Sequence, residues 1–579
     1  MAPEGHMEQG LVTSAAQHWQ ITCLLIALMI PLLTILATSL LSWISIARGG
    51  KQREPPLKPY WIPVLGDWFS FLLARKSLAD YVYRRFGDRH PVTIKLGPST
   101  AYLLTQPETY GPLLKDTRSC TNKAFAVLIM EQMFGTPKSA MHIYRNDKSG
   151  IGSTPVTGST VPSHLRVWHH QHKTASRFLQ GESLKQLGIR VIEHLSADLA
   201  KSDPNDPIDS GEWVDVPDFY TWWTHRLFAA AITALCGPYL VSLNPGFVDT
   251  FWEYMASWPT ISKFYPRVLA PRAYAARQRV LDAIKRWHAH ARQHSDYRDN
   301  GPDAPAWDEY WGSAWLKVRQ QWGQETGSMN DDALASEDLA LITAASANAL
   351  PMAFWILIEV FNDPELLGRV QGEISKAILP RDATDTVDGV TSSLPFRFDI
   401  TSITGSPLLQ SVYAEVLRIR VSLFHNRSPI QGDYTMGEYK LRQGGLVCIS
   451  TNIASNHARA WGKSRTARPL SQFWAERFLV PDSEDRDKVK FSTDGLEGAW
   501  MPYGGGSLMC PGRHLAKQEM MGGVAVFGAY FEMKVLKGPP RMDDRFYGLG
   551  AQPPRGPVPV RLRRKVGIMT PSARGMGKA

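Results

Sequence analysis

The sequence predicts a mainly α-helical fold with a minor β-sheet, built as one large domain behind a membrane-spanning amino-terminal helix. Helical patterns dominate the chain, whereas strand patterns are short and lie early and late in the sequence. Hydrophobic residues are 44% and charged residues 20% of the 579 residues, so a packed core is expected and wholesale disorder is excluded. No internal repeat is present, and glycine and proline are scattered without a period, which excludes collagen-like and coiled-coil folds.

The first expected element is an apolar helix over residues 21–46, a stretch without a charged side chain. Such a helix is roughly 39 Å long, which exceeds the hydrocarbon core of a bilayer, about 30 Å. No Lys or Arg precedes Arg48, and the apolar stretch is longer than the core of a signal peptide. We therefore expect a transmembrane anchor, with residues 1–20 in the lumen, rather than a secretory signal or a buried core helix.

A basic and proline-rich strap is expected over residues 47–63. Positive charge marks the cytosolic side of a membrane, so the rest of the chain is expected in the cytosol. In a eukaryote this orientation indicates a single-pass protein of the endoplasmic reticulum membrane. Prolines in this strap favour a stiff, extended segment, although an ordinary linker is compatible with the same residues. The basic residues are Arg48, Lys51, Arg53 and Lys58.

One large domain is expected over residues 64–565, followed by a flexible tail at residues 566–579. Helical patterns occupy residues 77–86, 164–179, 183–200, 222–235, 271–292, 336–361, 364–378 and 407–420. Strand patterns occupy residues 92–96, 101–104, 445–450 and 532–535. Polar stretches at residues 293–335 and 380–405 are predicted to be surface loops.

Cysteine usage and charge exclude several classes of protein. The five cysteines are far apart, which excludes a disulfide framework, a zinc ribbon and a CxxC redox pair. The net charge of +10 favours an acidic partner or an anionic membrane surface. Nucleic acid is not an expected partner, because the charge is spread out and no basic repeat interleaves with aromatic residues. The cysteines are Cys23, Cys120, Cys236, Cys448 and Cys510.

The most specific motif is MPYGGGSLMCPGRHLA at residues 501–516, where three consecutive glycines precede Cys510 and a helical pattern follows it. Glycines let a backbone approach a flat cofactor and adopt positive φ. A cysteine near a helix N-terminus is favoured as a thiolate, and a thiolate is the axial ligand of heme iron that favours O–O cleavage. The motif predicts a heme–thiolate site; a buried structural cysteine beside a glycine-rich turn is the alternative. A phosphate loop fits poorly, because no Lys-Ser/Thr follows the glycines.

This segment resembles the heme-ligand loop of the cytochrome P450 family, in which an aromatic residue and glycines precede Cys-x-Gly. The resemblance implies the cytochrome P450 fold and a heme b whose proximal iron ligand is Cys510. Leu508 stands where the family often has a basic residue, so one propionate contact of the family is not implied here. The positions that match are Tyr503, Gly504, Gly506, Cys510 and Gly512.

Three charged residues follow the family pattern in the expected order. Glu415 and Arg418 match the Glu-x-x-Arg pair of the family's K helix, and Arg477 matches the arginine of a later loop, although Ala475 replaces the usual proline. Taken alone, Glu415 and Arg418 would be read as a surface helical ion pair. The resemblance implies instead that the three residues support the heme side of the fold.

Three further residues are implied to contact the cofactor. Arg427, after the K helix, matches a family position that contacts a heme propionate. Trp168 and His172 stand where the family often has Trp-x-x-x-Arg, with histidine in place of arginine. A solvated, histidine-rich helix face is the alternative for this pair.

The helix expected at residues 336–361 corresponds to the family's I helix, which passes over the heme. Ser336, with two acids after it, is expected to begin the helix as a cap. Ala347 and Asn348 stand where most members have an acid and a threonine that deliver protons to bound oxygen. Pro351 has no N–H, so we expect a kink and a carbonyl without its helical partner at Ala347. Asn348 and Ala347 are the candidate catalytic residues; a helix-interior amide beside a plain bend is the alternative.

Residues 347–355 are similar to the branch that holds sterol 7α-hydroxylases, steroid 12α-hydroxylases and prostacyclin synthase, and to fungal secondary-metabolism enzymes. The resemblance implies a membrane-bound monooxygenase that oxidises a bulky apolar substrate, a steroid or terpenoid, with O2. Electrons would come from NADPH through an acidic flavoprotein, NADPH–cytochrome reductase. Because the acid–threonine pair is missing, a reductase-independent isomerase or dehydratase of an oxygenated lipid is an alternative. A non-catalytic membrane heme protein is another.

Overall fold

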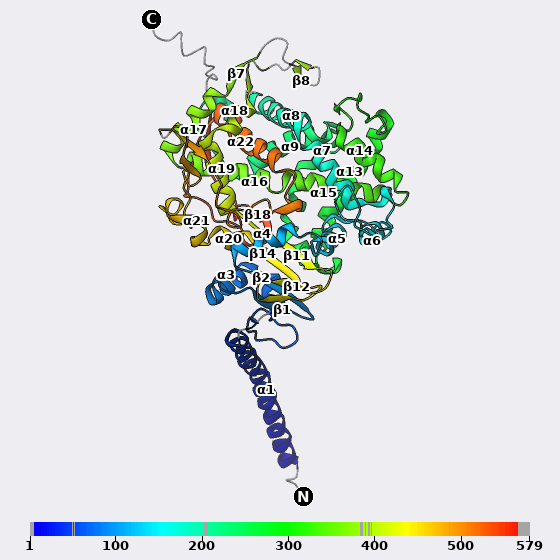
Figure 1. Cartoon of the computed structure of the whole chain (residues 1–579), viewed down its shortest axis with the longest axis vertical. Coiled ribbons are helices and arrows are strands. Elements are labelled where there is room, and N and C mark those ends of the chain that lie inside the picture. Colours follow the sequence, from blue (N-terminus) through cyan, green and yellow to red (C-terminus); the bar gives the residue numbers. More distant parts are fainter. Residues whose placement is uncertain are drawn as a thin grey trace. The chain divides into compact units, whose positions relative to one another are not determined.

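The computed structural model describes residues 5–565, apart from residues 49, 51, 202–206, 382–385, 388–389, 392–393, 395 and 486. Helices predominate in these residues and the strands form small sheets, as the predicted fold class requires (Figure 1). The chain divides into two compact units, one formed by residues 1–122 and 424–454 and the other by residues 123–423 and 455–579. Lys51 of the basic cluster and the predicted tail at residues 566–579 lie outside the described residues.

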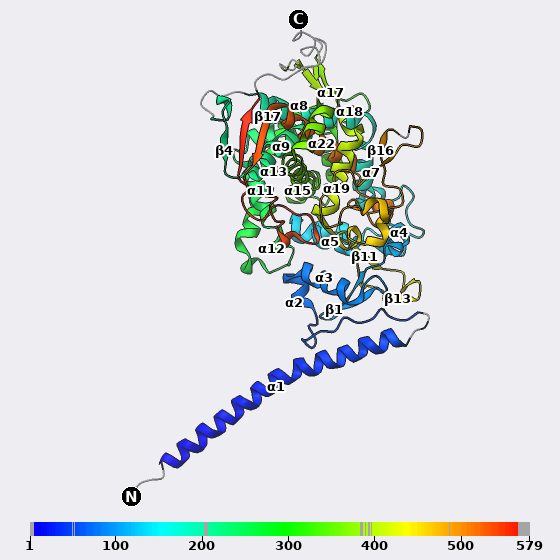
Figure 2. The same ribbon diagram turned by 90° about the vertical axis from the view of Figure 1, so that its left-hand side faces the viewer.

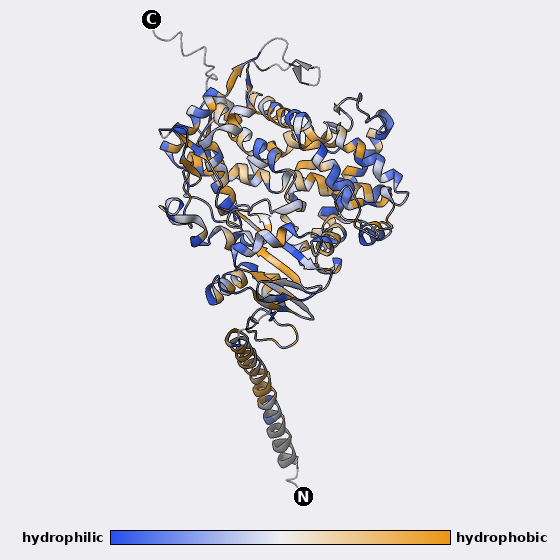
Figure 3. Ribbon diagram, in the orientation of Figure 1, coloured by the Kyte–Doolittle hydropathy of each residue, from blue (hydrophilic) through white to orange (hydrophobic). Residues whose placement is uncertain are grey.

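The first unit begins with helix α1 (Gly5–Ala47), which contains the predicted anchor. An 18-residue window between His18 and Ala47 reaches a mean hydropathy of 2.5, and this part is long enough to cross a membrane. Its large apolar side chains are exposed, Leu28 at 63% and Leu36 at 58%, and Pro31 lies inside the helix without ending it. Apolar colours dominate the coloured part of α1 in Figure 3, so α1 is a candidate transmembrane helix.

The proline-rich strap lies against a strand of the same unit. The backbone N–H of Lys58 donates to the carbonyl of Thr93, and the N–H of Thr93 donates to the carbonyl of Pro56, both at 2.8 Å. The Lys58 ammonium also forms an ion pair with Asp67 at 2.6 Å. These contacts hold the strap in the extended conformation that its prolines favour.

The sheet of the first unit runs in the order β1 (Val92–Leu96), β2 (Ser99–Leu104), β14 (Leu446–Ser450) and β11 (Val421–Pro429). Strands β1 and β2 are antiparallel, β14 is parallel to β2, and β11 is antiparallel to β14. The other elements of the first unit are α2 (Trp68–Leu73), α3 (Arg75–Phe86), α4 (Pro107–Lys115), β3 (Cys120–Thr121), β12 (Tyr434–Met436) and β13 (Tyr439–Leu441). Helix α20 (Thr451–Ser455) begins in the last residues of this unit.

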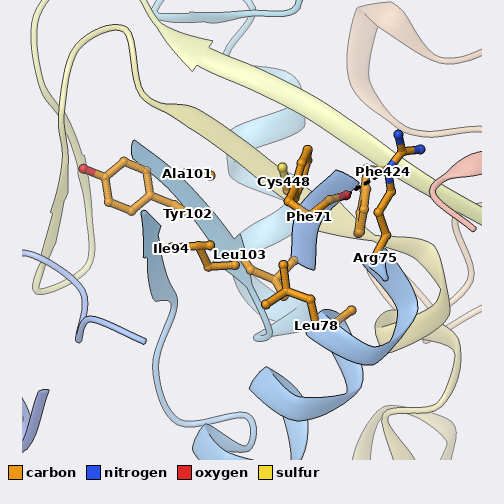
Figure 4. A pocket seen from close by; sticks show the side chains of 10 residues that line it. Phe71, Arg75, Leu78, Ile94, Ala101, Tyr102, Leu103, Phe424 and Cys448 are labelled. Atoms are coloured by element: carbon orange, nitrogen blue, oxygen red, sulfur yellow. Dashed lines mark hydrogen bonds between the residues drawn. The ribbon is translucent and has the colours of Figure 1, made fainter. Parts of the chain in front are cut away.

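A small apolar gap is lined by residues of α2, α3 and this sheet (Figure 4). The rings of Phe71 and Phe424 stack with their centroids 6.4 Å apart, and Arg75 Nε donates to the carbonyl of Phe71 at 3.2 Å. The gap measures about 10 Å³, which is room for one water at most. It is a packing gap and not a ligand site.

The second unit is built around α16 (Ala349–Phe361), in which every residue is buried. Helix α16 packs against α9 (Phe219–Cys236), α19 (Pro407–Arg420) and α22 (Arg513–Tyr530). Helix α8 (Gly181–Ala200) packs against both α9 and α22. The apolar face that each helix presents is therefore covered by several neighbours, as expected for a large helical core.

Small residues permit the closest of these helix contacts. A Cβ atom added to Gly522 of α22 would lie 2.6 Å from Ile192 of α8. A larger residue at this position therefore requires the Ile192 side chain to move. The close packing of α8 and α22 thus depends on a glycine at a particular position as well as on the hydrophobic pattern of the helices.

The remaining helices of the second unit are α5 (Lys123–Ile129), α6 (Met141–Asn146), α7 (Val167–Phe178), α10 (Tyr239–Ser242), α11 (Phe247–Ala256), α12 (Trp258–Ile261), α13 (Pro271–His294), α14 (Ala314–Glu325), α15 (Asp331–Ser346), α17 (Pro364–Lys376), α18 (Ile400–Gly405) and α21 (Ala458–Arg465). Strands β17 (Phe531–Val535), β19 (Val560–Arg564) and β4 (Val214–Val216) form one sheet (Figure 2). Residues 421–423 of β11 pair with β18 (Leu549–Ala551). Two-stranded pairs are β5 (Trp307–Asp308) with β6 (Gly312–Ser313), β7 (Ile378–Pro380) with β10 (Phe396–Phe398), β8 (Thr386–Val387) with β9 (Val390–Thr391), and β15 (Leu479–Pro481) with β16 (Val489–Phe491).

Two predicted surface loops are wrong. Residues 293–335 contain the β5–β6 pair and α14, with Trp311 fully buried. The polar residues of this stretch misled the prediction, because Lys317 and Arg319 of α14 are themselves buried and paired with carboxylates. The described part of residues 380–405 contains β10 and α18, which the side chain of Asp399 caps at its start.

Candidate active site

Cys510 lies at the end of an irregular loop, directly before α22, as the sequence predicts. The N–H of Cys510 donates to the carbonyl of Tyr503 at 2.9 Å and closes the loop. Gly504 and Gly506 have φ values of +77° and +67°, a region that favours glycine, whereas the extended φ of Gly505 suits any residue. Two of the three glycines are therefore required by the backbone of this loop.

The sulfur of Cys510 lies at the N-terminus of α22. Burial raises the pKa of its thiol, while the backbone N–H groups of Gly512 and Arg513 and the charge of Arg513 act in the opposite direction. The N–H groups expected at the start of the helix are thus directed at the sulfur, but the pKa of the thiol is still raised overall. A cation bound to the sulfur is needed to hold the thiolate at neutral pH.

Glu415, Arg418 and Arg477 meet in one cluster that is at most 2% exposed. Arg418 Nε lies 2.7 Å from Glu415 Oε2, and Arg477 Nε lies 2.8 Å from Glu415 Oε1. Arg477 also donates to the carbonyls of Pro469 and Gln472 at 3.1 and 3.0 Å. Complete burial excludes the surface ion pair that the two K-helix residues alone would suggest.

The long helix opposite the predicted oxygen site is broken where the sequence predicts a kink. Helix α15 ends at Ser346 and α16 begins at Ala349, so the break falls at Ala347 and Asn348, four and three residues before Pro351. The N–H of Ala551 in β18 donates to Asn348 Oδ1 at 2.8 Å. Within the part of the chain that the structure describes, Asn348 Nδ2 has no protein partner and remains able to donate.

The predicted start of this helix at Ser336 is wrong. Helix α15 begins at Asp331, and the side chain of Asn330 accepts from the N–H of Ala333 at 3.0 Å as its cap. Ser336 is fully buried inside the helix. Glu337 and Asp338, the two acids that follow Ser336, suggested the first turn of a helix. In the structure, an arginine from a different helix compensates their negative charge.

That arginine is Arg319 of α14. Its guanidinium lies 3.1 Å from Glu337 Oε2 and 2.8 Å from Asp338 Oδ1, and His288 Nε2 lies 2.9 Å from Asp338 Oδ2. Burial opposes the charge of Asp338, but Arg319 and His288 hold the pKa of this carboxyl below its usual value. Gln171 of α7 donates to Glu337 Oε1 at 2.8 Å, so the cluster connects four helices, α7, α13, α14 and α15.

Solvent-accessible residues occur in both segments that the sequence assigns to the site, the expected helix at residues 336–361 and the loop at residues 501–516. Ala344 of α15 and Asn348 in the helix break are exposed, although every residue of α16 is buried. No residue from 502 to 514 is buried. Residues of both elements are therefore open to contact with a bound ligand.

A cavity of about 250 Å³ borders the helix break at Ala347 and Asn348. It is lined by residues of α9, α11, α12 and the segment that contains β18. This volume is just below the range of typical small-molecule pockets, roughly 300–1,000 Å³. Its aromatic walls are Tyr220, Trp252, Trp258 and Phe546.

Trp168 and His172 lie on α7, as predicted. The indole N–H of Trp168 donates to the carbonyl of Tyr144 at 3.3 Å, so the protein already satisfies it. Burial, reinforced by the neighbouring His169, lowers the pKa of His172. The imidazole is therefore neutral at neutral pH and offers a hydrogen bond, where the family's arginine offers a charge.

Arg427 lies on β11, in the first unit, and is 5% exposed. One of its terminal nitrogens donates to the carbonyl of Asn426 at 2.9 Å, but the described residues give its buried Nε no partner. Burial lowers the pKa of this guanidinium, and Cys120 opposes that shift. A buried cation with an unsatisfied donor suits a carboxylate supplied by a cofactor.

The chemistry of these residues fits heme. Among residues 5–565, gaps excepted, no group of three or more His, Cys, Asp or Glu could hold a metal ion. Within these residues Cys510 therefore does not belong to a metal site of three or more such side chains. An accessible cysteine that follows a glycine-rich loop suits the thiolate ligand of a flat iron ring.

Local sequence patterns did not indicate the hydroxyl contact of Tyr503, which the resemblance had placed in the loop, or the burial of Tyr413 and Glu519. The hydroxyl oxygens of Tyr413 in α19 and Tyr503 are 2.5 Å apart. Glu519 in α22 is 2% exposed, its Oε2 atom has no partner among the described residues, and burial raises its pKa to about 8. Only the packing of the helices reveals these contacts, because a tyrosine or glutamate in a helix is ordinarily a surface residue.

Comparisons with known proteins agree with this chemistry. The family model for Cytochrome P450 matches residues 239–560. The chain is 31% identical to the Cytochrome P450 monooxygenase efuG of Hormonema carpetanum, over 96% of this chain and 99% of that protein. It is also 31% identical to the Cytochrome P450 monooxygenase fsoE of Humicola fuscoatra, over 89% of this chain and 88% of that protein. The 7-alpha-hydroxycholest-4-en-3-one 12-alpha-hydroxylase of Homo sapiens is 23% identical, over 88% of this chain and 93% of that protein.

Proposed function

The chain belongs to the cytochrome P450 family of monooxygenases, and on that premise we propose that it oxidises a bulky apolar substrate at a heme held by Cys510. Both the family and the mainly helical fold expected from the sequence are thereby confirmed. The observation that carries the proposal is the Cys510 loop. It is closed by the hydrogen bond to Tyr503 and followed at once by α22, whose first N–H groups are directed at the sulfur.

Heme bound through a thiolate supplies oxygen activation, because the sulfur donates electron density toward the iron. Glu415, Arg418 and Arg477 support the fold on this side, and Arg427 would pair with a propionate. The remaining positions of the matched loop, Tyr503, Gly504, Gly506 and Gly512, would shape the backbone against the ring. Trp168 and His172 would contribute at most neutral hydrogen bonds, for the reasons given above.

We propose that Asn348 orders a water molecule that takes part in proton delivery. Its Nδ2 donates to a water molecule, while its Oδ1 remains on the N–H of Ala551. The carbonyl of Ala347 accepts from the same water, because Pro351 has no N–H to occupy it. A single ordered water with these two contacts takes the place of the usual acid–threonine pair.

A steroid or terpenoid is the proposed substrate class. The relative from Homo sapiens is named for a steroid substrate, and the two fungal relatives are monooxygenases. The aromatic walls of the cavity beside Asn348 offer apolar contact of the kind that fused carbon rings require.

The protein is further proposed to be a single-pass protein of the endoplasmic reticulum membrane, with α1 as the anchor and the heme domain in the cytosol. Exposed apolar side chains along α1 and the basic residues Arg48 and Arg53 after it support this orientation. Electrons would come from NADPH through an acidic reductase, with which the net charge of +10 is compatible.

Reconstitution tests the monooxygenase proposal directly. Full-length protein is placed in vesicles with an NADPH–cytochrome reductase and offered a panel of steroids and terpenoids. Product that contains one atom of 18O from 18O2, and that forms only with NADPH, is expected. The substitution of the acid–threonine pair by Ala347 and Asn348 favours one alternative, an isomerase or dehydratase of an oxygenated lipid. Full turnover without NADPH or reductase would establish that alternative.

A further inference from the structure

Two tyrosine hydroxyl groups connect the Cys510 loop to α19. Tyr503 belongs to the loop, and Tyr413 belongs to α19, two residues before Glu415. Their oxygen atoms are 2.5 Å apart, at the short end of the range for an O–H···O hydrogen bond. Tyr413 is 4% exposed, so water does not compete for this contact.

Packing of the two aromatic rings does not by itself require their hydroxyl groups. A buried hydroxyl costs free energy unless it has a partner, whereas a phenylalanine fills nearly the same volume without that requirement. The family pattern at the loop position demands only an aromatic residue. The hydroxyl of Tyr503 is therefore not required by that pattern, and it is matched by a hydroxyl on the facing helix.

Helix α19 is itself held rigidly. Residues two apart on a helix point to different faces, so Tyr413 and Glu415 face different neighbours. Glu415 is locked to Arg477 at 2.8 Å in the buried ion cluster. The indole N–H of Trp500 donates to the carbonyl of Ala414 at 3.0 Å and adds a further contact between α19 and the residues that precede the loop.

From Tyr503 the connection continues to the cysteine. The carbonyl of Tyr503 accepts the N–H of Cys510 at 2.9 Å, so the position of Tyr503 sets the position of the Cys510 backbone. The chain of contacts thus runs from the buried ion cluster through α19 and the two hydroxyls to Cys510.

We propose that the Tyr413–Tyr503 hydrogen bond is a positioning device that holds Cys510 in the geometry of an iron ligand. Tyr503 and Tyr413 are positioning residues, since neither touches the reacting atoms. This inference rests on the proposed role of Cys510, and it adds to that role two residues that act through the backbone of the loop.

The test compares Tyr413→Phe, Tyr503→Phe and the double variant in the full-length, heme-loaded protein. Hydrogen–deuterium exchange of the peptide that contains the Cys510 amide is measured, together with the rate at which the long-wavelength ferrous–CO band decays. Each single variant should speed both processes by roughly 3- to 10-fold, the effect of one lost buried hydrogen bond. The double variant should be no more affected than the single variants, because all three lack the same bond and the double variant leaves no buried hydroxyl unpaired.

Tyr254→Phe is the matched control. Tyr254 is also fully buried, and its hydroxyl donates one hydrogen bond to the carbonyl of Met133 at 3.0 Å. This variant should leave exchange at Cys510 and decay of the band at the wild-type rate. An effect as large as that of Tyr503→Phe would show general loosening of the fold and would overturn the positioning role.

Two results separate this inference from the proposed function. If Cys510→Ser loses the long-wavelength band while both tyrosine variants behave as wild type, Cys510 remains the ligand and the positioning role is refuted. Additive effects of the two tyrosine substitutions would refute it as well. If Cys510→Ser keeps the band, the ligand assignment fails, and the positioning role fails with it.

Discussion

Asn348 Oδ1 accepts the N–H of Ala551 at 2.8 Å, which fixes the break between α15 and α16 to strand β18. One atom of this amide is thereby committed to structure, and Nδ2 remains for chemistry. The two roles can be separated by substitution, because each depends on a different atom of the same side chain.

Asn348→Asp should keep the acceptor for Ala551 and lose the Nδ2 donor. We expect its melting temperature to stay near that of the wild type and the product formed per NADPH to fall, by up to the roughly 10²- to 10⁴-fold of one proton-transfer contact. Asn348→Leu loses both functions and should in addition lose about 1–3 kcal/mol of stability, since the Ala551 N–H is left without a partner. Unchanged product per NADPH in both variants would make Asn348 a structural residue only.

Gly550→Ala should displace Asn348 without altering it. An added Cβ at Gly550 would lie 2.3 Å from Asn348 Oδ1, and the φ of +133° disfavours any larger residue. We expect both stability and product per NADPH to fall. Gly556→Ala is the control, because its φ of +92° is also positive but its Cβ would meet nothing within 4 Å. Equal losses in the two variants would assign the effect to backbone strain alone.

Glu415→Gln should destabilise the heme side of the second unit severely. The substitution leaves Arg418 and Arg477 buried without a counter-charge, which typically costs about 3–5 kcal/mol. We expect a low yield of heme-loaded protein and a large fall in melting temperature. Glu532→Gln, at an exposed ion pair with Arg563, should cost less than about 1 kcal/mol. A Glu415 variant as stable as this control would contradict the structural role of the cluster.

Glu519 should make the protein less stable as pH rises. Burial raises its pKa to about 8 in the folded protein, from an ordinary value of 4.5. Between these values the unfolded chain loses the proton that the folded protein keeps, so stability is complete below about pH 4.5 and falls until about pH 8. The slope is at most roughly 1.4 kcal/mol per pH unit, the value for one proton.

The comparison of Glu519→Gln with the wild type checks this dependence, because glutamine does not ionise. Melting temperatures measured from pH 5 to pH 9 should diverge in favour of the variant as pH rises, and should run parallel above pH 8. Parallel curves over the whole range would show that Glu519 titrates normally or is paired in solution.

Features that depend on neighbours in the sequence were predictable. The pattern at residues 407–420 gave α19 with its bounds, and Pro351 located the helix break, because both effects act within one or two helical turns. The Cys510 loop was recognisable for the same reason. Gly504 and Gly506 must adopt positive φ, and this requirement is local.

Features that depend on distant partners were not predictable. Arg319 and Asp338 look like surface charges until α14 and α15 meet. The partner of Asn348 lies 203 residues away, on a strand that no local pattern connects to the helix break. A polar residue is expected to be exposed only when it has no buried partner for its charge or hydrogen bonds. Whether such a partner exists is decided by tertiary packing alone.

The central claim is that Cys510 is the iron ligand of a heme enzyme, and the ferrous–CO spectrum tests it most directly. The wild-type protein should show the long-wavelength band typical of thiolate ligation, and Cys510→Ser should lose it. Cys120→Ser, Cys236→Ser and Cys448→Ser, which alter buried cysteines elsewhere, should keep it. A Cys510→Ser protein that retains the band, or loss of the band in one of the other three variants instead, would contradict the account.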